Sequence, residues 1–420
     1  MPVKNSGLTL VLLTHSFPYA SGEQFLETEI EYLAARFQRI ILVPFRNQGA
    51  ARPVPDNIEV DTSLAKCSAK GLIARVLRAG IASLGSGLFY REIMARPLTL
   101  IQWPALVRVV VYTDNFCQSA SWLRDFMRRC GLVDAIFYTY WLGPQTLAVR
   151  RAKERFSAIK LISRVHEGDL YEYRFAPPYL PFRQQTLRGV DRVFAISEHG
   201  QRYLAERYPS VAQYEVSRLG VNDPGFLAPF HAEDKFHVVS CSSLEARKRV
   251  ELLIEGLRLF AGTYLPHLVI EWHHLGEGPL RTSLEALAKR ELPATVQWCF
   301  HGQLPNRQVI EFYRTHPVDV FVNVSTSEGI PVSIMEAQSC GIPVIATAVG
   351  GVPEIVTNEN GILLESTPSP QAIADALAQF AARTVDVSAR REASPQMWKS
   401  MYHAETNYNA FVDRLIELFG

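Results

Sequence analysis

Short apolar runs that recur between segments of helix length place the strongest constraint on the fold of this chain. Such runs are too short for most buried helices and too continuous for strands with one solvent face, so they are typical of parallel strands buried on both faces. The segments between several of them are long enough to be crossover helices. In the first half the runs are LTLVLL (8–13), RIILVPF (39–45), AIKLISRV (158–165) and RVFAIS (192–197).

The same alternation starts again after residue 235, and it predicts a second domain of the same kind. The runs there are FHVVSCSS (236–243), HLVIEWHHLG (267–276), TVQWCFHG (295–302), VDVFVNVS (318–325) and PVIATAV (343–349). A stretch rich in Gly, Pro and acidic residues, 220–235, separates the two series as a linker. A chain of 420 residues also exceeds what one core usually organises.

We therefore predict an α/β fold with two Rossmann-like, doubly wound domains that face each other across a cleft. The N-terminal domain is expected over residues 1–222, and the C-terminal domain over 236–396. The last segment, 397–420, has an amphipathic pattern, and we expect one helix there that packs back on the N-terminal domain.

Charge and cysteine content narrow the class of protein. With 43 basic and 42 acidic residues the chain is nearly neutral, so it lacks the global charge of a nucleic-acid-binding protein. Its six cysteines are far apart without a C-x-x-C pair, which argues against metal sites and suits a reducing cytoplasm. The first apolar run is too short for a signal peptide or a membrane span. We expect a cytoplasmic protein.

The segment 61–132 is apolar and basic. It contains ten Lys or Arg residues against four Asp or Glu residues, a net charge of +6. An amphipathic basic surface suits peripheral contact with an anionic membrane or with a lipid-diphosphate acceptor. Core helices with solvated arginines explain the same composition, and both interpretations stay open.

Two glutamates flank a predicted helix start in the segment SEGIPVSIMEAQSCGIPVIATAVGGVPEIV (327–356). Pro331 suits the first turn of a helix that Gly341 ends, so the amides near Pro331 would suit a phosphate. Glu328 lies just before this helix, and Glu336 about 7–8 Å deeper along it. Two carboxylates around an anion site fit a diphosphate with hydroxyl groups at both ends. Alternatively, Glu328 is solvated and Glu336 pairs locally.

Six ordered segments resemble family 4 of the retaining glycosyltransferases, which have the GT-B fold, and in particular its branch for bacterial exopolysaccharides and surface glycans. The resemblance runs from about residue 8 to the end, except for roughly 50–130. Besides 327–356, which carries the E-x7-E motif, the segments are FPYASGEQFLETEI, YTYWL, SRVHEGDLYEYR, SSLEARKRVELLIEGL and HHLGEGPLR.

The resemblance implies roles for the residues that match. Glu328 would contact hydroxyls of the donor sugar, and Glu336 the ribose of the nucleotide. Lys248 would neutralise the diphosphate leaving group. His166 would hydrogen-bond the donor sugar near the reacting carbon, so His166, Lys248 and Glu328 are the predicted catalytic residues. The other predicted donor-binding residues are Gly22, Gly329, Ile330, Pro331 and Val332.

One position departs from the family pattern. The family usually has an arginine five residues before the lysine, where this chain has Ser243. Arg247 or Arg249 would have to supply the missing charge, unless both are solvated residues at a helix start.

The resemblance implies a transferase that moves a sugar from a nucleotide-diphosphate sugar to a glycan or polyprenyl-diphosphate-linked acceptor with retention. We expect a UDP-sugar first and a GDP-sugar second, with no cofactor and no nucleic-acid partner. Because the chain has no D-x-D run, we also predict that transfer needs no metal. A nucleotide-sugar epimerase of similar fold and a non-catalytic sugar-nucleotide-binding protein remain as alternatives.

Overall fold

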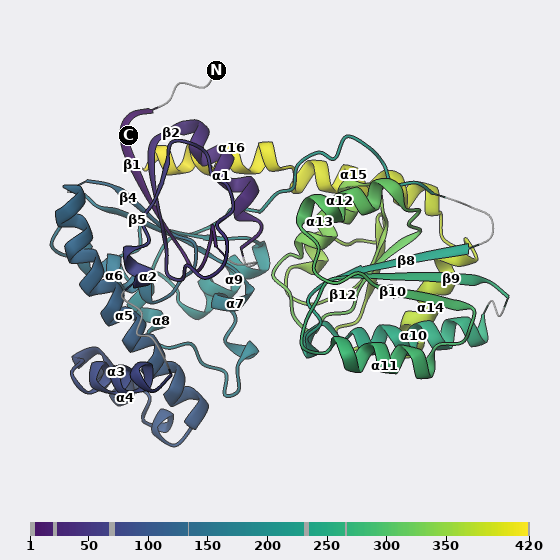
Figure 1. Cartoon of the computed structure of the whole chain (residues 1–420), viewed down its shortest axis with the longest axis horizontal. Helices are drawn as coiled ribbons and strands as arrows, with labels where there is room; N and C mark the ends of the chain where they lie inside the picture. Colours follow the sequence, from purple (N-terminus) through teal and green to yellow (C-terminus); the bar gives the residue numbers. More distant parts are fainter. Residues whose placement is uncertain are drawn as a thin grey trace. The chain divides into compact units, whose positions relative to one another are not determined.

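The computed structural model describes residues 5–19, 23–66, 72–132, 134–230, 235–264 and 267–418. The chain divides into two compact units (Figure 1). Unit 1 comprises residues 1–217 and 408–420, and unit 2 comprises residues 218–407. Each unit is built on one parallel sheet flanked by helices, so the predicted class, α/β with two Rossmann-like domains, is confirmed.

Unit 1 contains a seven-stranded sheet in the order β3-β2-β1-β4-β5-β6-β7. Its strands are β1 (Asn5–Thr14), β2 (Phe37–Pro44), β3 (Ile58–Val60), β4 (Ile136–Thr139), β5 (Lys160–Val165), β6 (Arg192–Ala195) and β7 (Tyr214–Val216). Its α-helices are α1 (Leu26–Arg36), α2 (Ser63–Lys66), α3 (Leu72–Leu84), α4 (Gly87–Ala95), α5 (Trp103–Cys130), α6 (Pro144–Lys153), α7 (Glu167–Leu170), α8 (Arg183–Leu187) and α9 (Glu198–Arg207).

The continuous apolar runs form strands because both faces of this sheet are covered. Successive side chains point to opposite faces. Leu10 and Leu12 of β1 belong to the core beneath α1 and the C-terminal helix α16 (Ala404–Glu417). Val11 and Leu13 belong to the core beneath α5, α6 and α9.

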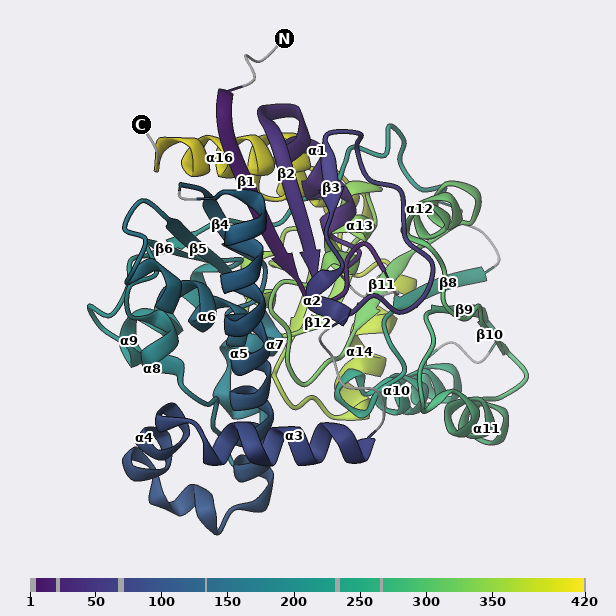
Figure 2. The same cartoon turned by 60° about the vertical axis from the view of Figure 1, so that its left-hand side comes forward.

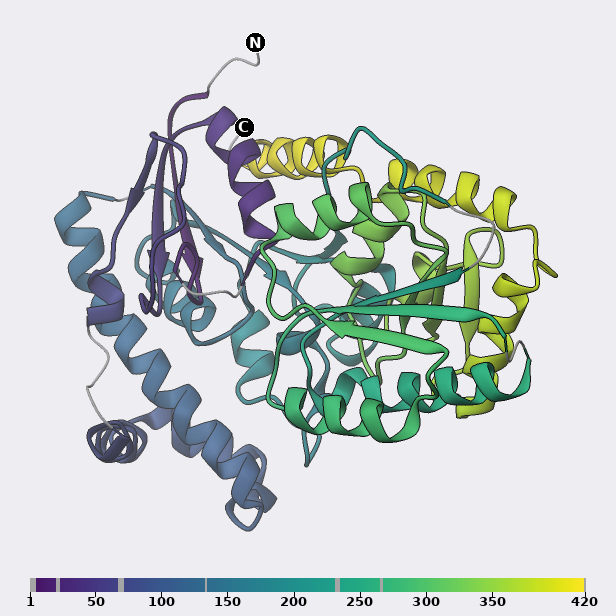
Figure 3. The ribbon, with the colours of Figure 1, turned by 45° about the vertical axis from the view of Figure 1, so that its right-hand side comes forward.

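Unit 2 contains a six-stranded sheet in the order β10-β9-β8-β11-β12-β13. Figure 3 shows this sheet with helices on both of its faces. The strands are β8 (Lys235–Cys241), β9 (Val269–Leu275), β10 (Val296–Phe300), β11 (Val320–Asn323), β12 (Val344–Thr347) and β13 (Gly361–Leu364). The α-helices are α10 (Val250–Thr263), α11 (Arg281–Glu291), α12 (Asn306–Thr315), α13 (Val332–Ser339), α14 (Pro370–Ala381) and α15 (Val387–Met401).

The end of the chain differs from the single helix predicted over 397–420. There are two helices, α15 and α16, and the chain breaks between them at Tyr402 and His403. Backbone hydrogen bonds hold the break: Val221 N donates to Tyr402 O at 3.0 Å, and Ala404 N donates to Val221 O at 3.1 Å. A periodicity argument could not show this, because the competing partner lies far away in the sequence. Only the part of α16 from Tyr408 onward belongs to unit 1.

A fully buried ion pair joins α1 to the sheet of unit 1. Arg164 Nη1 on β5 lies 3.2 Å from Glu29 Oε2 on α1, and both side chains are 0% exposed. The hydroxyl of Tyr138 donates to Glu29 at 2.8 Å. The guanidinium of Arg164 also lies over the ring of Phe411, 4.1 Å from its centroid, which fixes α16 to the same site.

The basic apolar segment of the sequence forms helices α2 to α5. Figure 2 shows α3 and α4 beside the end of the long helix α5. Leu88 of α4 and Ala105 and Val109 of α5 belong to a small core that they share with residues of α6. Arg78 of α3 donates to Asp114 of α5 through two bonds of 2.9 Å.

Candidate functional site

The candidate site of unit 2 lies where the order of its strands reverses. β8 is the first strand of the unit, and it has β9 on one side and β11 on the other. In open parallel sheets, ligands bind at the carboxyl ends of the strands at this point. A pocket is present there, and its polar lining includes Ser240, Ser242, Lys248, Asn323 and Ser325.

Glu328 and Lys248 form a buried ion pair beside this pocket. Lys248 Nζ donates to Glu328 Oε1, and the two side chains are only 10% and 7% exposed. Ser325 Oγ donates to the same carboxylate at 2.6 Å, and Asn323 Nδ2 at 3.3 Å. Burial raises the pKa of Glu328, but the Lys248 charge and the bonds from Lys248 and Ser325 outweigh it and hold the pKa below its ordinary value. The alternative of a solvated Glu328 is therefore wrong.

The loop that carries Glu328 is fixed by the loop after β12. Gly351 N donates to Gly329 O at 2.8 Å. Gly350 has a φ of +54°, and a Cβ there would lie 1.8 Å from the carbonyl oxygen of Glu328. A side chain at position 350 would thus displace the backbone of Glu328. The Gly-Gly pair in the sequence serves to position the carboxylate.

Glu336 is also buried, but it has no cationic partner among the described residues. It lies in α13, and its Oε1 accepts a hydrogen bond from Asn306 Nδ2 at the start of α12. Burial raises its pKa to about 8, an effect that the bond from Asn306 opposes. The charge of Glu336 in turn affects the thiol of Cys241 at the end of β8, and so does that of Lys248. Cys241 thus lies within electrostatic range of Glu336 and of Lys248, the partner of Glu328.

The raised pKa of Glu336 predicts a pH dependence of stability. A carboxyl whose pKa is higher in the folded state stabilises fully below its unfolded pKa, near 4.5, and loses this contribution as pH rises through about 8. We expect the free energy of unfolding to fall less steeply between pH 5 and pH 8 in Glu336→Gln than in the unsubstituted protein. Urea unfolding at each pH measures both slopes. Equal slopes would contradict the assignment.

The predicted donor-binding residues next to Glu328 surround the start of α13. Pro331 is the N-cap, Val332 the first helical residue, and Ile330 is buried. Ile334 N donates to Pro331 O at 3.1 Å, so this amide is already paired. The first helical amides, at Val332 and Ser333, are those that a helix leaves without internal partners. The amide of Ile334 is therefore not available to a phosphate.

The arginines considered as substitutes at Ser243 differ in their contacts. The guanidinium of Arg249 donates to the carbonyls of Val324 at 2.6 Å, Ser325 at 2.8 Å and Ser366 at 3.0 Å. Through these bonds Arg249 stabilises the loop after β11, so its guanidinium is already paired. Arg247 contacts Glu245 at 3.1 Å, and its charge helps to lower the pKa of Glu328. Arg247 is therefore the better candidate for a second positive charge at this site.

His166 lies in unit 1, directly after β5. It is 5% exposed, and neither ring nitrogen has a hydrogen-bond partner in the described ranges. The ring packs against Tyr140 and Trp141, with centroids 4.7 and 4.5 Å away, and against Phe25. Burial, with a smaller effect of Arg164, holds its pKa well below the ordinary value, so the ring is neutral at pH 7. Gly22 lies outside the described residues.

Sequence reasoning did not find four residues that hold these sites together. Ser325, Asn323 and Asn306 bind the two glutamates of unit 2. In unit 1, Asp169 accepts from His166 N at 2.7 Å and from Leu142 N at 2.6 Å, which joins the loops after β4 and β5. The only signal in the sequence was the position of these polar residues at the end of an apolar run or within four residues after one.

Comparisons with known proteins match unit 2 to a family model. Residues 228–394 match the family model of glycosyl transferases group 1. A protein of Escherichia coli (strain K12) named as a colanic acid biosynthesis glycosyltransferase, WcaL, is 27% identical over 294 residues, 67% of this chain and 70% of its own length.

Solved structures of two other proteins are similar over nearly the whole chain. The lipopolysaccharide outer core galactosyltransferase WaaB has a TM-score of 0.67 at 14% identity and covers 97% of this chain and 99% of its own. Anabaena Alr3699/HepE in complex with UDP-glucose has a TM-score of 0.63 at 15% identity and covers 98% and 100%. Both likenesses concern the fold. Residues 228–394 thus match the model of glycosyl transferases group 1, and the chain has the GT-B fold.

Proposed function

We propose that this protein is a retaining glycosyltransferase that takes a sugar from a nucleotide-diphosphate sugar, a UDP-sugar before a GDP-sugar. Its acceptor is a glycan or a polyprenyl-diphosphate-linked saccharide of an exopolysaccharide or surface glycan. The observation that carries the proposal is the buried pair of Lys248 and Glu328. It lies at the carboxyl ends of the strands of unit 2, where the strand order reverses. A binding or catalytic role explains such a pair better than stability does, because desolvation cancels much of its attraction.

The pair supplies the two kinds of contact that donor cleavage needs. Lys248, aided by Arg247, would meet negative charge as it develops on the departing diphosphate. Glu328 stays ionised, because its pKa is lowered, and so accepts hydrogen bonds from sugar hydroxyls. Glu336 would hold the ribose through its own carboxyl. His166, as a neutral imidazole, is proposed to hydrogen-bond the donor sugar.

The name and bound ligand of relatives support the donor class. HepE is described in complex with UDP-glucose, and WcaL is named for colanic acid biosynthesis. We expect thermal-shift assays to show a raised melting temperature with one nucleotide-diphosphate family, most strongly with UDP or UDP-sugars, whether or not EDTA is present. A ligand at about 100 times its Kd adds roughly 2.7 kcal/mol to the free energy of unfolding.

Product analysis distinguishes this proposal from the two alternatives. Retaining transfer predicts an acceptor-dependent product with the anomeric configuration of the donor. Conversion of the nucleotide sugar without any acceptor would indicate an epimerase. A thermal shift with no turnover on any lipid-linked or free glycan would favour a non-catalytic binding protein. Loss of turnover when EDTA is added and its return with Mg²⁺ would contradict metal independence.

A large exposed apolar surface on unit 1 supports membrane contact. This surface extends over α3, α4, the segment 96–102 and the start of α5. The described part of the chain has no helix long and apolar enough to cross a membrane. Twelve of its seventeen exposed large hydrophobic side chains lie between Val76 and Val111, including Met94, Ile101 and Trp103 at 81%, 80% and 72% exposure.

The charges around this surface complement an anionic bilayer. Residues 76–111 contain four arginines and a single acid, Glu92. Glu92 is buried, where it accepts hydrogen bonds from Tyr179 and from Phe182 N. The surface therefore presents arginines and apolar side chains without an exposed carboxylate. We propose that it docks on the membrane that carries the lipid-linked acceptor.

Vesicle flotation tests this surface. We expect the triple variant Met94→Ser/Ile101→Ser/Trp103→Ser to lose binding to vesicles that contain anionic lipid, because each substitution removes an exposed apolar side chain. Phe156→Ser is the matched control, since Phe156 is 40% exposed on the same unit but outside the surface. The membrane proposal would be contradicted if the unsubstituted protein did not bind the vesicles. It would also be contradicted if the unsubstituted protein were a dimer in solution and the triple variant a monomer.

A further inference from the structure

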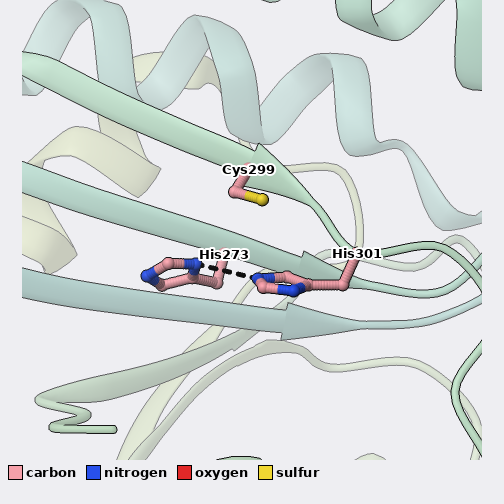
Figure 4. A group of neighbouring side chains, drawn as sticks. All are labelled: His273, Cys299 and His301. Atoms are coloured by element: carbon pink, nitrogen blue, oxygen red, sulfur yellow. Dashed lines mark hydrogen bonds between the residues drawn. The ribbon is translucent and has the colours of Figure 1, made fainter.

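A group of side chains with metal-ligand chemistry lies in unit 2, outside the residues discussed so far. It consists of His273 on β9, Cys299 on β10 and His301 just after β10 (Figure 4). Their ligand atoms all lie within 4.8 Å of one another. Among the described residues, no other group of three or more His, Cys, Asp or Glu side chains lies close enough to share one ion.

The register of two strands places the three side chains together. Cys299 and His273 are direct partners in the parallel pairing of β10 with β9, so their side chains lie on the same face of the sheet. His301 follows Cys299 by two residues, and a period of two returns the side chain to that face. His301 N donates to His274 O at 2.9 Å, which continues the pairing beyond the end of β10.

The two imidazoles already approach as ligands of one ion do. His273 Nδ1 and His301 Nε2 are 3.0 Å apart and share a hydrogen bond. With Zn–N distances of about 2.0–2.1 Å, a tetrahedral site separates two nitrogens by about 3.3–3.4 Å. If the two rings moved apart by a few tenths of an ångström, both nitrogens could bind one ion in place of the hydrogen bond. Burial is the largest cause that lowers the pKa of His273 to about 4, and burial also lowers the pKa of His301. Both rings are therefore neutral at pH 7.

The surroundings hold the rings in place and keep the thiol accessible. Phe312 on α12 packs against both rings, with centroids 5.3 and 5.2 Å away. Cys299 is exposed, so an ion can reach it from solvent.

We propose that His273, Cys299 and His301 bind one Zn²⁺ ion. Two imidazoles and one thiolate are the ligand set that this borderline-soft cation prefers, and a water would take the fourth tetrahedral position. On binding, the Cys299 thiol releases its proton to solvent. The proton between the two rings moves to the other nitrogen of its own ring, which frees both facing lone pairs. The cysteine spacing alone pointed away from metal because the ligands come from two strands.

Stoichiometric titration tests the site in the full-length protein without an affinity tag. The protein is stripped with a chelator and titrated with Zn²⁺ in competition with a chromogenic chelator. We expect one equivalent to bind, and Cys299→Ser and His273→Gln each to weaken binding by at least about tenfold. Cys130→Ser and His267→Gln are the controls, because neither residue belongs to the group, and we expect both to bind as the unsubstituted protein does.

Cobalt provides a readout that does not depend on affinity. Co²⁺ in this site should show a thiolate-to-metal charge-transfer absorption that Cys299→Ser lacks and Cys130→Ser retains. Thermal unfolding without metal checks that the variants are folded. Failure to bind one equivalent of Zn²⁺, or equal affinity in the unsubstituted protein and both group variants, would overturn the proposal. The donor-binding assays with EDTA are independent of this result.

Discussion

Replacing Lys248 with methionine is expected to lower the rate of sugar transfer by about 100-fold or more, the usual cost of removing a charge that stabilises a transition state. Methionine keeps most of the length and volume of lysine but has no ammonium group. The diphosphate would then leave without its nearest positive charge, and Glu328 would lose its ion-pair partner. Steady-state kinetics with a UDP-sugar and an acceptor measures the loss.

The same substitution is expected to destabilise the fold, because it leaves the buried carboxyl of Glu328 unpaired. Removing one partner of a buried pair typically costs about 3–5 kcal/mol. The double variant Lys248→Met/Glu328→Gln separates the two effects. It should recover most of the free energy of unfolding, since no charge remains buried, but none of the transfer activity. Normal turnover in Lys248→Met would remove this residue from the proposed mechanism.

The second large effect is expected in unit 1, at the buried pair of Glu29 and Arg164. Glu29→Gln should lower the free energy of unfolding by about 3–5 kcal/mol, because it leaves a guanidinium with no exposed surface and no counter-charge. Arginine cannot lose its proton to relieve this cost. Arg164→Met should cost less, because burial already raises the pKa of Glu29 and the carboxyl can become neutral.

Urea unfolding of three variants tests this asymmetry. We expect Glu29→Gln to be the least stable, Arg164→Met to be intermediate, and Glu29→Gln/Arg164→Met to recover much of the loss. The control is Arg39→Met, which breaks the exposed pair of Arg39 with Glu59 at 2.9 Å. That pair should contribute at most about 1 kcal/mol. Equal effects at the buried and exposed pairs would contradict the argument from desolvation.

The sequence by itself determined most of the strands of the two sheets, although it did not show β3, β4, β7 or β13. The apolar runs at 8–13 and 39–45 became β1 and β2, and the run at 318–325 became β11 with Glu328 in the loop behind it. These features are local. A strand covered on both faces is mostly apolar, because nearly all of its side chains are buried whatever its neighbours are. The placement of Glu328 after a strand and of Glu336 inside the following helix was predictable for the same reason.

Only the tertiary structure decided what each of these glutamates touches. Lys248 precedes Glu328 by 80 residues, and Asn306 precedes Glu336 by 30. Both contacts depend on the order of strands in the sheet, which apolar periodicity does not encode. The role of Arg249 and the break between α15 and α16 likewise depend on carbonyl and amide groups that come close only in the folded chain. Local patterns specify elements, because the spacing of apolar residues determines which faces of a helix or strand can be buried. The partners of buried charges are instead specified by the packing of those elements together.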